Sequence, residues 1–276
     1  MIAVNSIASV FLPVLYALTA LLYGLAFFEE TPFAKKWKSK FLIATAVVHT
    51  MYIGSYTVTN GHCLVTSPFE IMSLIAFTII ICYTVIELIT RIKGTGFFLI
   101  SLALIFEFFS AVTIPLQGDT SVNPVLSELG IGLHVTAAII GYGGIAISAV
   151  YGVLYLLMYR DLKKGNFGSL YQHFPSLESL ESLNTVATIL GFLFLTIALG
   201  IGAIWLPTYF PTFSFLDPKL IVSFFIWVVY AVVLTAKYVF KIDGKRVITL
   251  SLSGFVLAVF SLTIVNAFLD SFHRFM

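Results

Sequence analysis

The sequence predicts an all-α fold, a polytopic membrane helix bundle of about eight transmembrane helices with both termini external. The first observation behind this prediction is composition. Of the 276 residues, 59% are hydrophobic and only 10% are charged, and the mean hydropathy is +1.03. A soluble domain carries about 25% charged residues. The composition therefore excludes a soluble domain with one anchor, and we expect a single integral membrane domain over residues 1–276.

The second observation is a series of apolar segments, each close to the ~20 residues that a helix needs to cross the hydrocarbon core. They cover residues 9–28, 41–59, 70–90, 96–115, 129–159, 185–205, 220–240 and 247–269. The fifth segment is the longest, so we expect it to project from the bilayer at one end. Each segment is predicted to form one spanning helix.

The third observation is the distribution of basic residues, which gives the orientation. The loops after the first, third, fifth and seventh segments hold 13 of the 15 Lys and Arg residues. By the positive-inside rule these four loops are cytoplasmic and both termini are external. The expected location is the bacterial inner (cytoplasmic) membrane, crossed several times by the chain. The net charge of +2 gives no indication of nucleic-acid binding.

The fifth span carries a histidine, His134, about one turn from its external end. The same side of this helix carries Ala138, Gly141 and Ser148, which follow at helical spacing. Small residues at this spacing favour close helix packing, and for Gly141 alone we prefer that interpretation. A histidine beside small residues also suits a flat ligand such as porphyrin, whose iron binds neutral imidazole.

A second external histidine, His273, follows the eighth span. In the sequence SFHRFM it is typical of an interfacial residue with aromatic neighbours. The predicted topology places it near the same membrane face as His134. Together the two imidazoles would supply both axial ligands of one iron.

His49 lies in the middle of the second span, on a stripe with Thr45, Tyr52 and Tyr56, and Glu107 is the ionisable residue of the fourth span. A rise of ~1.5 Å per residue places His49 roughly 12 Å and Glu107 roughly 16 Å from the cytoplasmic edge, so the two can pair. Two alternatives stay open: a structural hydrogen bond that locks two helices, and a ligand or proton-relay role.

Two further segments carry weaker signals. The external loop GHCLVTSPFE contains His62 and Cys63, but two adjacent metal ligands without a second cluster are a weak metal signal. We interpret the loop as a solvated turn before the third span, with Glu70 at the helix N-terminus. The cytoplasmic segment FPSLESLESLNT has leucines at three-residue spacing, which predicts a short amphipathic helix at the membrane surface, either a partner contact or a linker.

Several ordered elements carry a resemblance to a known family. They are ELGIGLHV at 128–135, SLESLNTVATILGFLFLTIALGIGAIW at 179–205, DPK at 217–219 followed by Trp227 and Tyr230, Gly254-Phe255, and Val265-Asn266 before His273. In order and spacing the chain resembles the cytochrome c assembly superfamily of haem-handling membrane proteins (CcsA/ResC/CcmC), closest to its eight-span HemX/YpjD-like branch. The resemblance is best over residues 128–276.

The resemblance implies specific site residues. Two external histidines of the family ligate haem iron, and they match His134 and His273. The family loop WGxxWxWDPKE forms an aromatic shelf for the porphyrin, and the equivalent stretch here is FPTFSFLDPKL, residues 210–220. It retains Asp217, Pro218 and Lys219. Aromatic residues stand near the tryptophan positions: Phe210, Phe213 and Phe215. The span-seven histidine of the family is replaced by Thr235.

The function implied is a haem-binding membrane protein of cytochrome c assembly or haem trafficking, with b-type, non-covalent haem and His49 as a second, deeper site. The first alternative is a HemX-type regulator of tetrapyrrole synthesis that acts through loop 160–184, and the second is a small-molecule transporter. Expected partners are haem, the lipid bilayer, and another cytochrome c assembly subunit or a haem-synthesis enzyme. We expect no enzymatic activity, because the sequence has no nucleophile–base pair, phosphate loop or HExxH motif.

Overall fold

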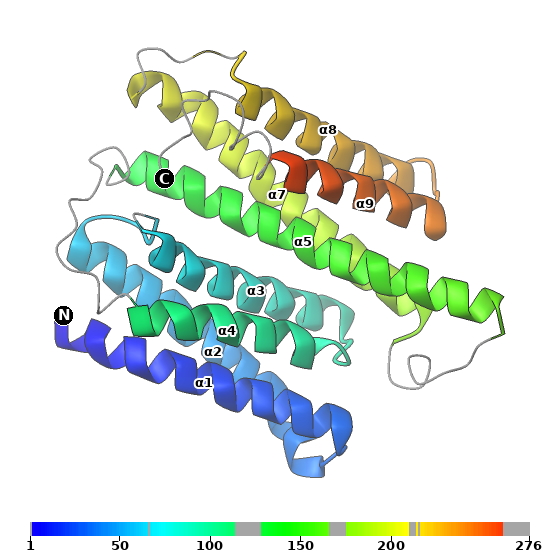
Figure 1. Ribbon diagram of the computed structural model, residues 1–276, viewed down its shortest axis with the longest axis horizontal. Coiled ribbons are helices and arrows are strands. Elements are labelled where there is room, and N and C mark those ends of the chain that lie inside the picture. The colour runs from blue at the N-terminus through cyan, green and yellow to red at the C-terminus, as the bar shows by residue number, and fades with distance from the viewer. Residues whose placement is uncertain are drawn as a thin grey trace. The chain divides into compact units, whose positions relative to one another are not determined.

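The computed structural model describes residues 2–65, 67–113, 128–165, 175–209, 214 and 216–261. Within these ranges the chain forms helices and no strands, which confirms the predicted all-α bundle (Figure 1). The helices are α1 (Ile2–Phe28), α2 (Pro32–Asn60), α3 (Pro68–Thr90), α4 (Gly96–Thr113), α5 (Leu129–Lys163), α7 (Leu177–Tyr209), α8 (Pro218–Tyr238) and α9 (Lys245–Phe260). Each predicted span overlaps one of them.

Six of the described helices are long and apolar enough to cross a membrane, namely α1, α2, α3, α5, α7 and α8. α4 contributes a shorter apolar helix, Gly96–Val112, and α9 has 16 described residues. α5 has 35 residues and is therefore about 52 Å long. It exceeds the ~30 Å hydrocarbon core, in agreement with the prediction that it projects from the bilayer.

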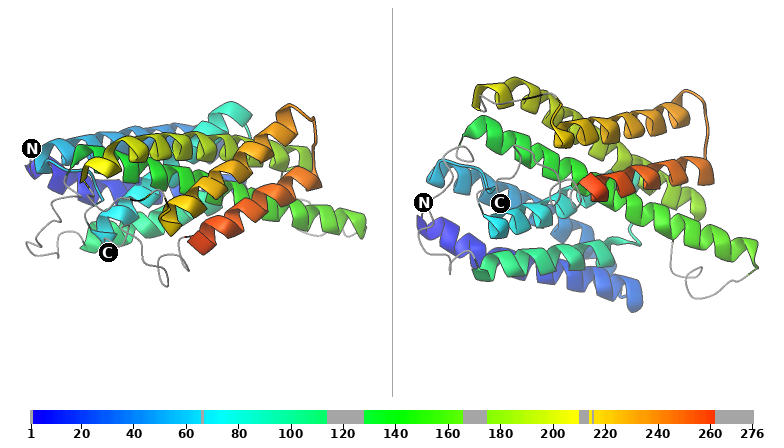
Figure 2. Two further views of the ribbon diagram at one scale, coloured as in Figure 1. Left: turned by 90° about the horizontal axis from the view of Figure 1, so that it is seen from above. Right: turned by 45° about the horizontal axis from the view of Figure 1, so that its top comes forward.

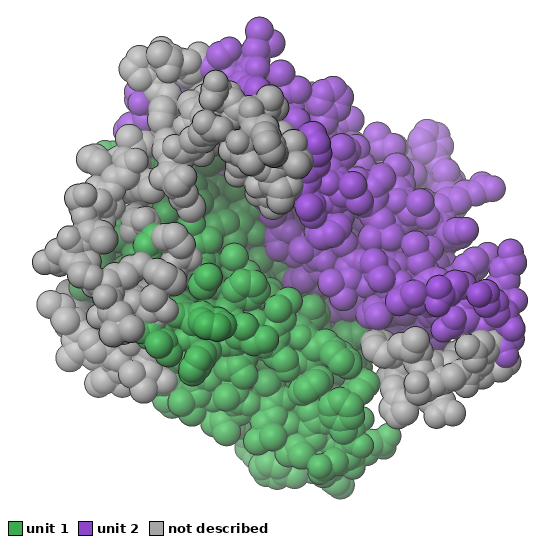
Figure 3. Space-filling view, in the orientation of Figure 1, with its two compact units in different colours: residues 1–139 green, residues 140–276 purple. Residues whose placement is uncertain are grey.

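The chain divides into two compact units, Met1–Ile139 and Ile140–Met276, and the boundary lies within α5 (Figure 3). In the first unit, α1 contacts α2 and α4, and α3 contacts the same two helices. The four helices therefore form a closed ring in which α1 and α4 run side by side (Figure 2). The prediction of a single domain over residues 1–276 stays a prediction.

The first unit sorts apolar side chains by helix face. On α1 the aromatic and polar residues Tyr16, Thr19 and Tyr23 are buried, whereas Phe11 and Leu18 are exposed. Apolar side chains on an exposed face suit a helix whose outer surface meets lipid. In a membrane the inner face can therefore hold the polar groups, provided that they find partners.

The second unit contains a close contact between α5 and α7. A Cβ atom added to Gly144 would lie 2.7 Å from the backbone N of Gly191, and one added to Gly141 would lie 2.9 Å from the backbone N of Leu195. The helices approach this closely because glycine has no side chain at the contact. The packing role predicted for Gly141 is confirmed. α8 packs on α7 and α9 around a core that includes Ile226.

Candidate functional site

His134 lies in the second turn of α5, where it is half-buried. The residues that follow it, Val135 and Ile139, pack against a cluster that contains Cys63 and Leu74. A Cβ atom on Gly132 would lie 2.8 Å from the Cys63 sulfur. The start of α5 is therefore held tightly against the loop between α2 and α3, and this contact fixes the helix turn that carries His134.

The loop itself differs from the prediction of a solvated turn. Cys63, Leu64 and Val65 are buried, and only the flanking residues are more exposed. The apolar CLV run inserts beneath the start of α5, and this burial is the physical reason for the error. The predicted position of Glu70 is confirmed, because Glu70 lies in the first turn of α3, where its backbone N–H donates to the hydroxyl of the N-cap residue Ser67 at 3.2 Å.

Asp217 is the N-cap of α8. Its carboxylate accepts hydrogen bonds from the backbone N–H groups of Lys219 at 2.9 Å and Leu220 at 3.4 Å, and Pro218 occupies the first turn. Asp217 is 7% exposed. The Lys219 ammonium donates to the Ser261 carbonyl at 3.0 Å, so the DPK segment also ties the start of α8 to the end of α9.

Four of the predicted site residues lie outside the described residues: Phe210, Phe213, Phe215 and His273. Within the described ranges, no group of three or more His, Cys, Asp or Glu side chains could hold a metal ion. The structure places His134 in the second turn of α5 and Asp217 at the N-cap of α8. Thr235, which stands at the position of the family's span-seven histidine, is exposed on α8.

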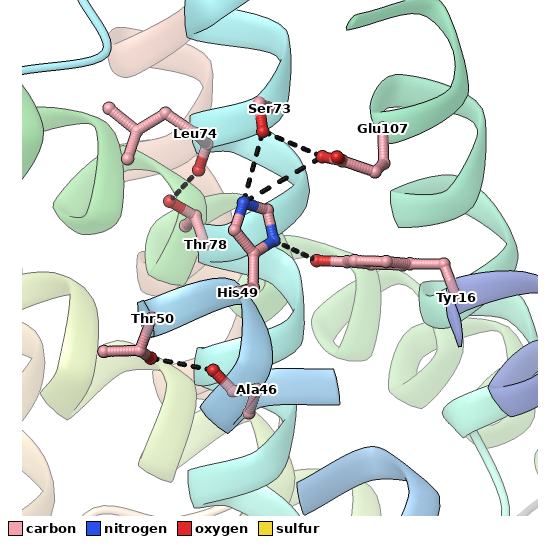
Figure 4. A network of polar contacts seen from close by, with 8 residues as sticks. All are labelled: Tyr16, Ala46, His49, Thr50, Ser73, Leu74, Thr78 and Glu107. Carbon is pink, nitrogen blue, oxygen red and sulfur yellow. Dashed lines mark hydrogen bonds and ion pairs between the residues drawn. The ribbon is translucent and has the colours of Figure 1, made fainter. Parts of the chain in front are cut away.

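His49 and Glu107 lie together in the centre of the first unit, as the sequence predicts (Figure 4). The His49 Nε2 and Glu107 Oε2 atoms are 3.9 Å apart, which is too long for a hydrogen bond. Ser73 bridges them. Its hydroxyl lies 3.2 Å from His49 Nε2 and donates to Glu107 Oε2 at 2.9 Å. On the opposite side of the imidazole, the Tyr16 hydroxyl lies 2.9 Å from His49 Nδ1.

The directions of these hydrogen bonds assign the histidine tautomer. Because Ser73 donates to Glu107, its oxygen accepts a hydrogen bond from the N–H group at His49 Nε2. Nδ1 is then the unprotonated nitrogen, and it accepts from the Tyr16 hydroxyl. One ordered chain of donors thus runs from α1 through α2 and α3 to α4. Both ring nitrogens are occupied, which supports the hydrogen-bonding alternative for His49.

Sequence reasoning did not identify a second buried network, in the unit formed by residues 140–276. The Asn184 amide donates to the Ser148 carbonyl at 2.7 Å and to its hydroxyl at 2.8 Å, and Thr188 lies 2.7 Å from the same hydroxyl. Ser251 completes the group at 3.1 Å from Ser148, and Tyr230 donates to the Ser251 carbonyl. The residue that could have indicated this network from sequence is Asn184, a strongly polar side chain in an apolar helix.

The predicted amphipathic segment also differs from the structure. Residues 177–183 form the first two turns of α7, and Leu180 and Leu183 are fully buried. Glu181 accepts a hydrogen bond from the Lys237 ammonium at 2.5 Å and from the Gly244 backbone N–H at 3.1 Å. The segment is therefore neither a separate helix at the membrane surface nor a linker, because its apolar side packs inside the unit.

Comparison with known proteins places the chain in a family. The family described as Cytochrome C assembly protein matches residues 65–273, more than half of the chain. Protein HemX of Bacillus subtilis (strain 168) is 25% identical over 95% of both chains. Cytochrome c biogenesis protein CcsA of Guillardia theta is 24% identical over 89% of this chain and 87% of its own length.

A further relative, protein HemX of Brevibacillus brevis, is 26% identical over 81% of this chain and 82% of its own length. No solved structure matches the chain. The matched family range begins at residue 65, well before the region 128–276 where the resemblance is best in sequence. These matches support a membrane protein of cytochrome c biogenesis or of a haem-related function. The chain belongs to the cytochrome c assembly protein family.

Proposed function

We propose that this protein binds haem and acts in cytochrome c assembly or haem trafficking, with the haem held at the external face by His134 and His273. Family membership is the observation that carries the proposal. His134 suits an iron ligand because its imidazole is half-buried near a helix end, on a helix turn that is fixed by the contact between Gly132 and Cys63. Haem, when bound, would supply an iron that the imidazole nitrogens of His134 and His273 would ligate.

The aromatic residues Phe210, Phe213 and Phe215 are proposed to line the porphyrin. Support comes from the residues that follow them in the chain. Asp217 caps α8, and Lys219 donates to the Ser261 carbonyl, so the position at which the aromatic segment enters α8 is fixed. Ser261 in turn precedes the stretch that leads to His273.

We propose that the haem is b-type and bound non-covalently, and the cysteines support this. Covalent attachment of haem uses a C-x-x-C-H motif, whereas this chain has only Cys63 and Cys82, nineteen positions apart. Both cysteines are buried, with Cys63 8% exposed and Cys82 2% exposed. Neither thiol is presented to a ligand, so the proposed haem is held by its iron ligands and by stacking alone.

A haem titration tests this proposal. The full chain, purified in a mild detergent, is titrated with hemin, and the Soret band is recorded for the wild type and for His134→Ala and His273→Ala. Each variant should shift or lose the band. His62→Ala is the matched control, because His62 is another histidine of the predicted external side and its Nδ1 lies 2.9 Å from the Cys63 carbonyl.

Two results would overturn the proposal. One is a wild-type protein that takes up no hemin, and the other is a Soret band that survives both His134→Ala and His273→Ala unchanged. Extraction with acidified acetone examines the bond type separately. Haem that remains with the protein after extraction would contradict non-covalent binding.

A second candidate function is regulation of tetrapyrrole synthesis through a cytoplasmic partner. The match to protein HemX over 95% of both chains favours it. Residues 177–183 belong to α7 and are anchored by the buried Leu180 and Leu183, so their deletion would disrupt the fold as well as any docking surface. The sharper test replaces residues 166–174 with a Gly/Ser segment of equal length. Loss of capture of a haem-synthesis enzyme with unchanged hemin uptake would support regulation, and unchanged capture would reject a role for this segment.

A further inference from the structure

A cavity of about 400 Å³ lies between α2 and α3. It lies at the end of the first unit that holds Arg91 and Lys93, which we call the basic end. One end of its lining is polar and includes Ser39, Arg91 and Lys93, and the other is apolar and includes Ile43 and Leu88. Both walls of the cavity carry a polar residue and an apolar residue one helical turn apart. Ser39 precedes Ile43 by four residues on α2, and Leu88 precedes Arg91 by three at the end of α3, so each wall changes from polar to apolar over one turn.

Arg91 ends α3 in an unusual way. It is the C-cap residue and has a left-handed backbone, with φ 58° and ψ 13°. Glycine is the usual residue in this conformation, because a Cβ atom disfavours it. The Arg91 side chain is exposed, and its guanidinium has no partner among the described residues. An arginine at a position that favours glycine, with a guanidinium that makes no hydrogen bond to the described residues, suggests an anionic ligand.

The other charged groups at the cavity already have hydrogen-bond or ion-pair partners within the protein. The Lys93 ammonium donates to the Ser39 hydroxyl at 2.8 Å and lies 3.9 Å from Glu87 Oε1. The Lys38 ammonium donates to the Lys93 carbonyl at 3.3 Å. Glu87 is buried, and its other oxygen accepts a hydrogen bond from the Tyr23 hydroxyl. Three cations therefore face one carboxylate that is already hydrogen-bonded, and the mouth of the cavity has an excess of positive charge.

The apolar part of the lining faces outward. Leu88 is 61% exposed and Ile43 is 42% exposed, as expected for side chains that meet acyl chains. By the positive-inside rule the basic end lies at the cytoplasmic surface, where anionic lipid headgroups gather and attract basic groups. A ligand with a phosphate at one end and an aliphatic chain at the other matches both parts of the lining.

We propose that this cavity binds an anionic glycerophospholipid of the cytoplasmic leaflet. Its phosphate contacts Arg91 and Lys93, and one acyl chain lies along Ile43 and Leu88. The site is independent of the proposed haem site, because all of its residues belong to α2, α3 and the segment after α3. Arginine suits the phosphate because its guanidinium presents two parallel N–H donors.

The test uses the full chain in a neutral detergent, with thermal unfolding followed by a thiol-reactive dye. Phosphatidylglycerol should raise the unfolding midpoint, and the same amount of phosphatidylcholine should not. Arg91→Gln should weaken the apparent affinity for phosphatidylglycerol at least about fivefold, the effect of about one cationic contact at a membrane surface. Lys36→Gln is the matched control, because Lys36 is an exposed cation of the same basic end that does not line the cavity.

Arg91→Gly separates binding from folding. Glycine adopts a positive φ without a steric penalty, so this variant should unfold at an equal or higher temperature without lipid and should still lose the protection by phosphatidylglycerol. Equal weakening by Arg91→Gln and Lys36→Gln would overturn the proposal in favour of diffuse surface charge. Protection by inorganic phosphate at the same concentration would overturn it in favour of a free-anion site.

Discussion

Replacing Ser73 by alanine should destabilise the first unit by about 1 to 3 kcal/mol, because one hydroxyl joins His49 to Glu107. Ser73 is buried and makes two hydrogen bonds, at 3.2 Å to His49 Nε2 and 2.9 Å to Glu107 Oε2. Without it the two groups lie 3.9 Å apart, beyond hydrogen-bond distance. The imidazole N–H and the carboxylate would then both lose a partner inside the helix ring.

The magnitude follows from two limits. Hydrogen bonds between membrane helices contribute about 0.6 kcal/mol each on average, so the loss of two gives about 1 kcal/mol. A buried polar group left without a partner costs about 1–3 kcal/mol, which sets the upper end. At about 2–4 °C per kcal/mol for a chain of this size, the unfolding midpoint should fall by about 2 to 12 °C.

Ser110 provides the matched control. It is also a buried serine in the first unit, on α4, but its hydroxyl has no hydrogen-bond partner among the described residues. Ser110→Ala should therefore be neutral or stabilising. The two substitutions make the same change in helix propensity, so the difference between them isolates the hydrogen bonds of Ser73.

A thiol-reactive dye suits the measurement. The two cysteines of the chain, Cys63 and Cys82, are both buried and both belong to the first unit. Their reaction with the dye on heating therefore reports unfolding of the unit that contains Ser73. Scans at one fixed heating rate are compared, because membrane proteins commonly unfold irreversibly. Unfolding midpoints of Ser73→Ala and Ser110→Ala that agree within about 2 °C, the shift caused by about 0.5 kcal/mol, would refute the proposed bridging role.

Three other predictions concern the second unit. Gly144→Ala should destabilise it by about 1–3 kcal/mol, because the new Cβ would lie 2.7 Å from the Gly191 backbone, whereas Gly200→Ala, with open space around its Cβ, should be neutral or stabilising. Both are measured in thermal scans followed by circular dichroism, because the two cysteines that react with the dye lie in the first unit. Glu181→Gln should lower the unfolding temperature, because the variant loses the ion pair between Glu181 and the Lys237 ammonium at 2.5 Å. High salt should reduce the difference in unfolding temperature between the wild type and this variant. Asp217→Ala should cost about 0.5–2 kcal/mol as a lost helix cap, and Asp217→Asn should retain most of that stability.

The fold was predictable from sequence because its signal is strong. A segment of about twenty apolar residues has few alternatives in a membrane, and each predicted span overlaps a helix. The start of α7 was placed wrongly because Glu178 and Glu181 interrupt the apolar run. A carboxylate in a helix end does not stop the helix when a partner is near, and Glu181 has one in Lys237. Lys237 lies 56 positions from Glu181 in sequence, so the residues around Glu181 give no indication of this partner.

The site was predictable only in part, and the reason is again the range of the interactions. His49 and Glu107 could be paired from sequence because two ionisable groups at one depth in a membrane need partners. Ser73 and Tyr16 could not be added, since single hydroxyl groups are common in membrane helices and carry no positional signal. For the loop at Cys63, the apolar CLV run was the available signal, but the polar residues around it favoured a solvated turn.

Two of the described histidines, His49 and His134, are unequal as iron ligands. His49 is fully buried and uses both ring nitrogens. Coordinating iron would break at least one of these hydrogen bonds and leave Tyr16 or Ser73 unsatisfied, at a cost of about 1–3 kcal/mol. His134 is half-buried near the end of α5, on a helix turn that the Cys63 loop already fixes. An iron site at His134 therefore leaves the hydrogen bonds at the centre of the first unit intact, whereas one at His49 would break at least one of them, which is why we assign the proposed haem to His134 first.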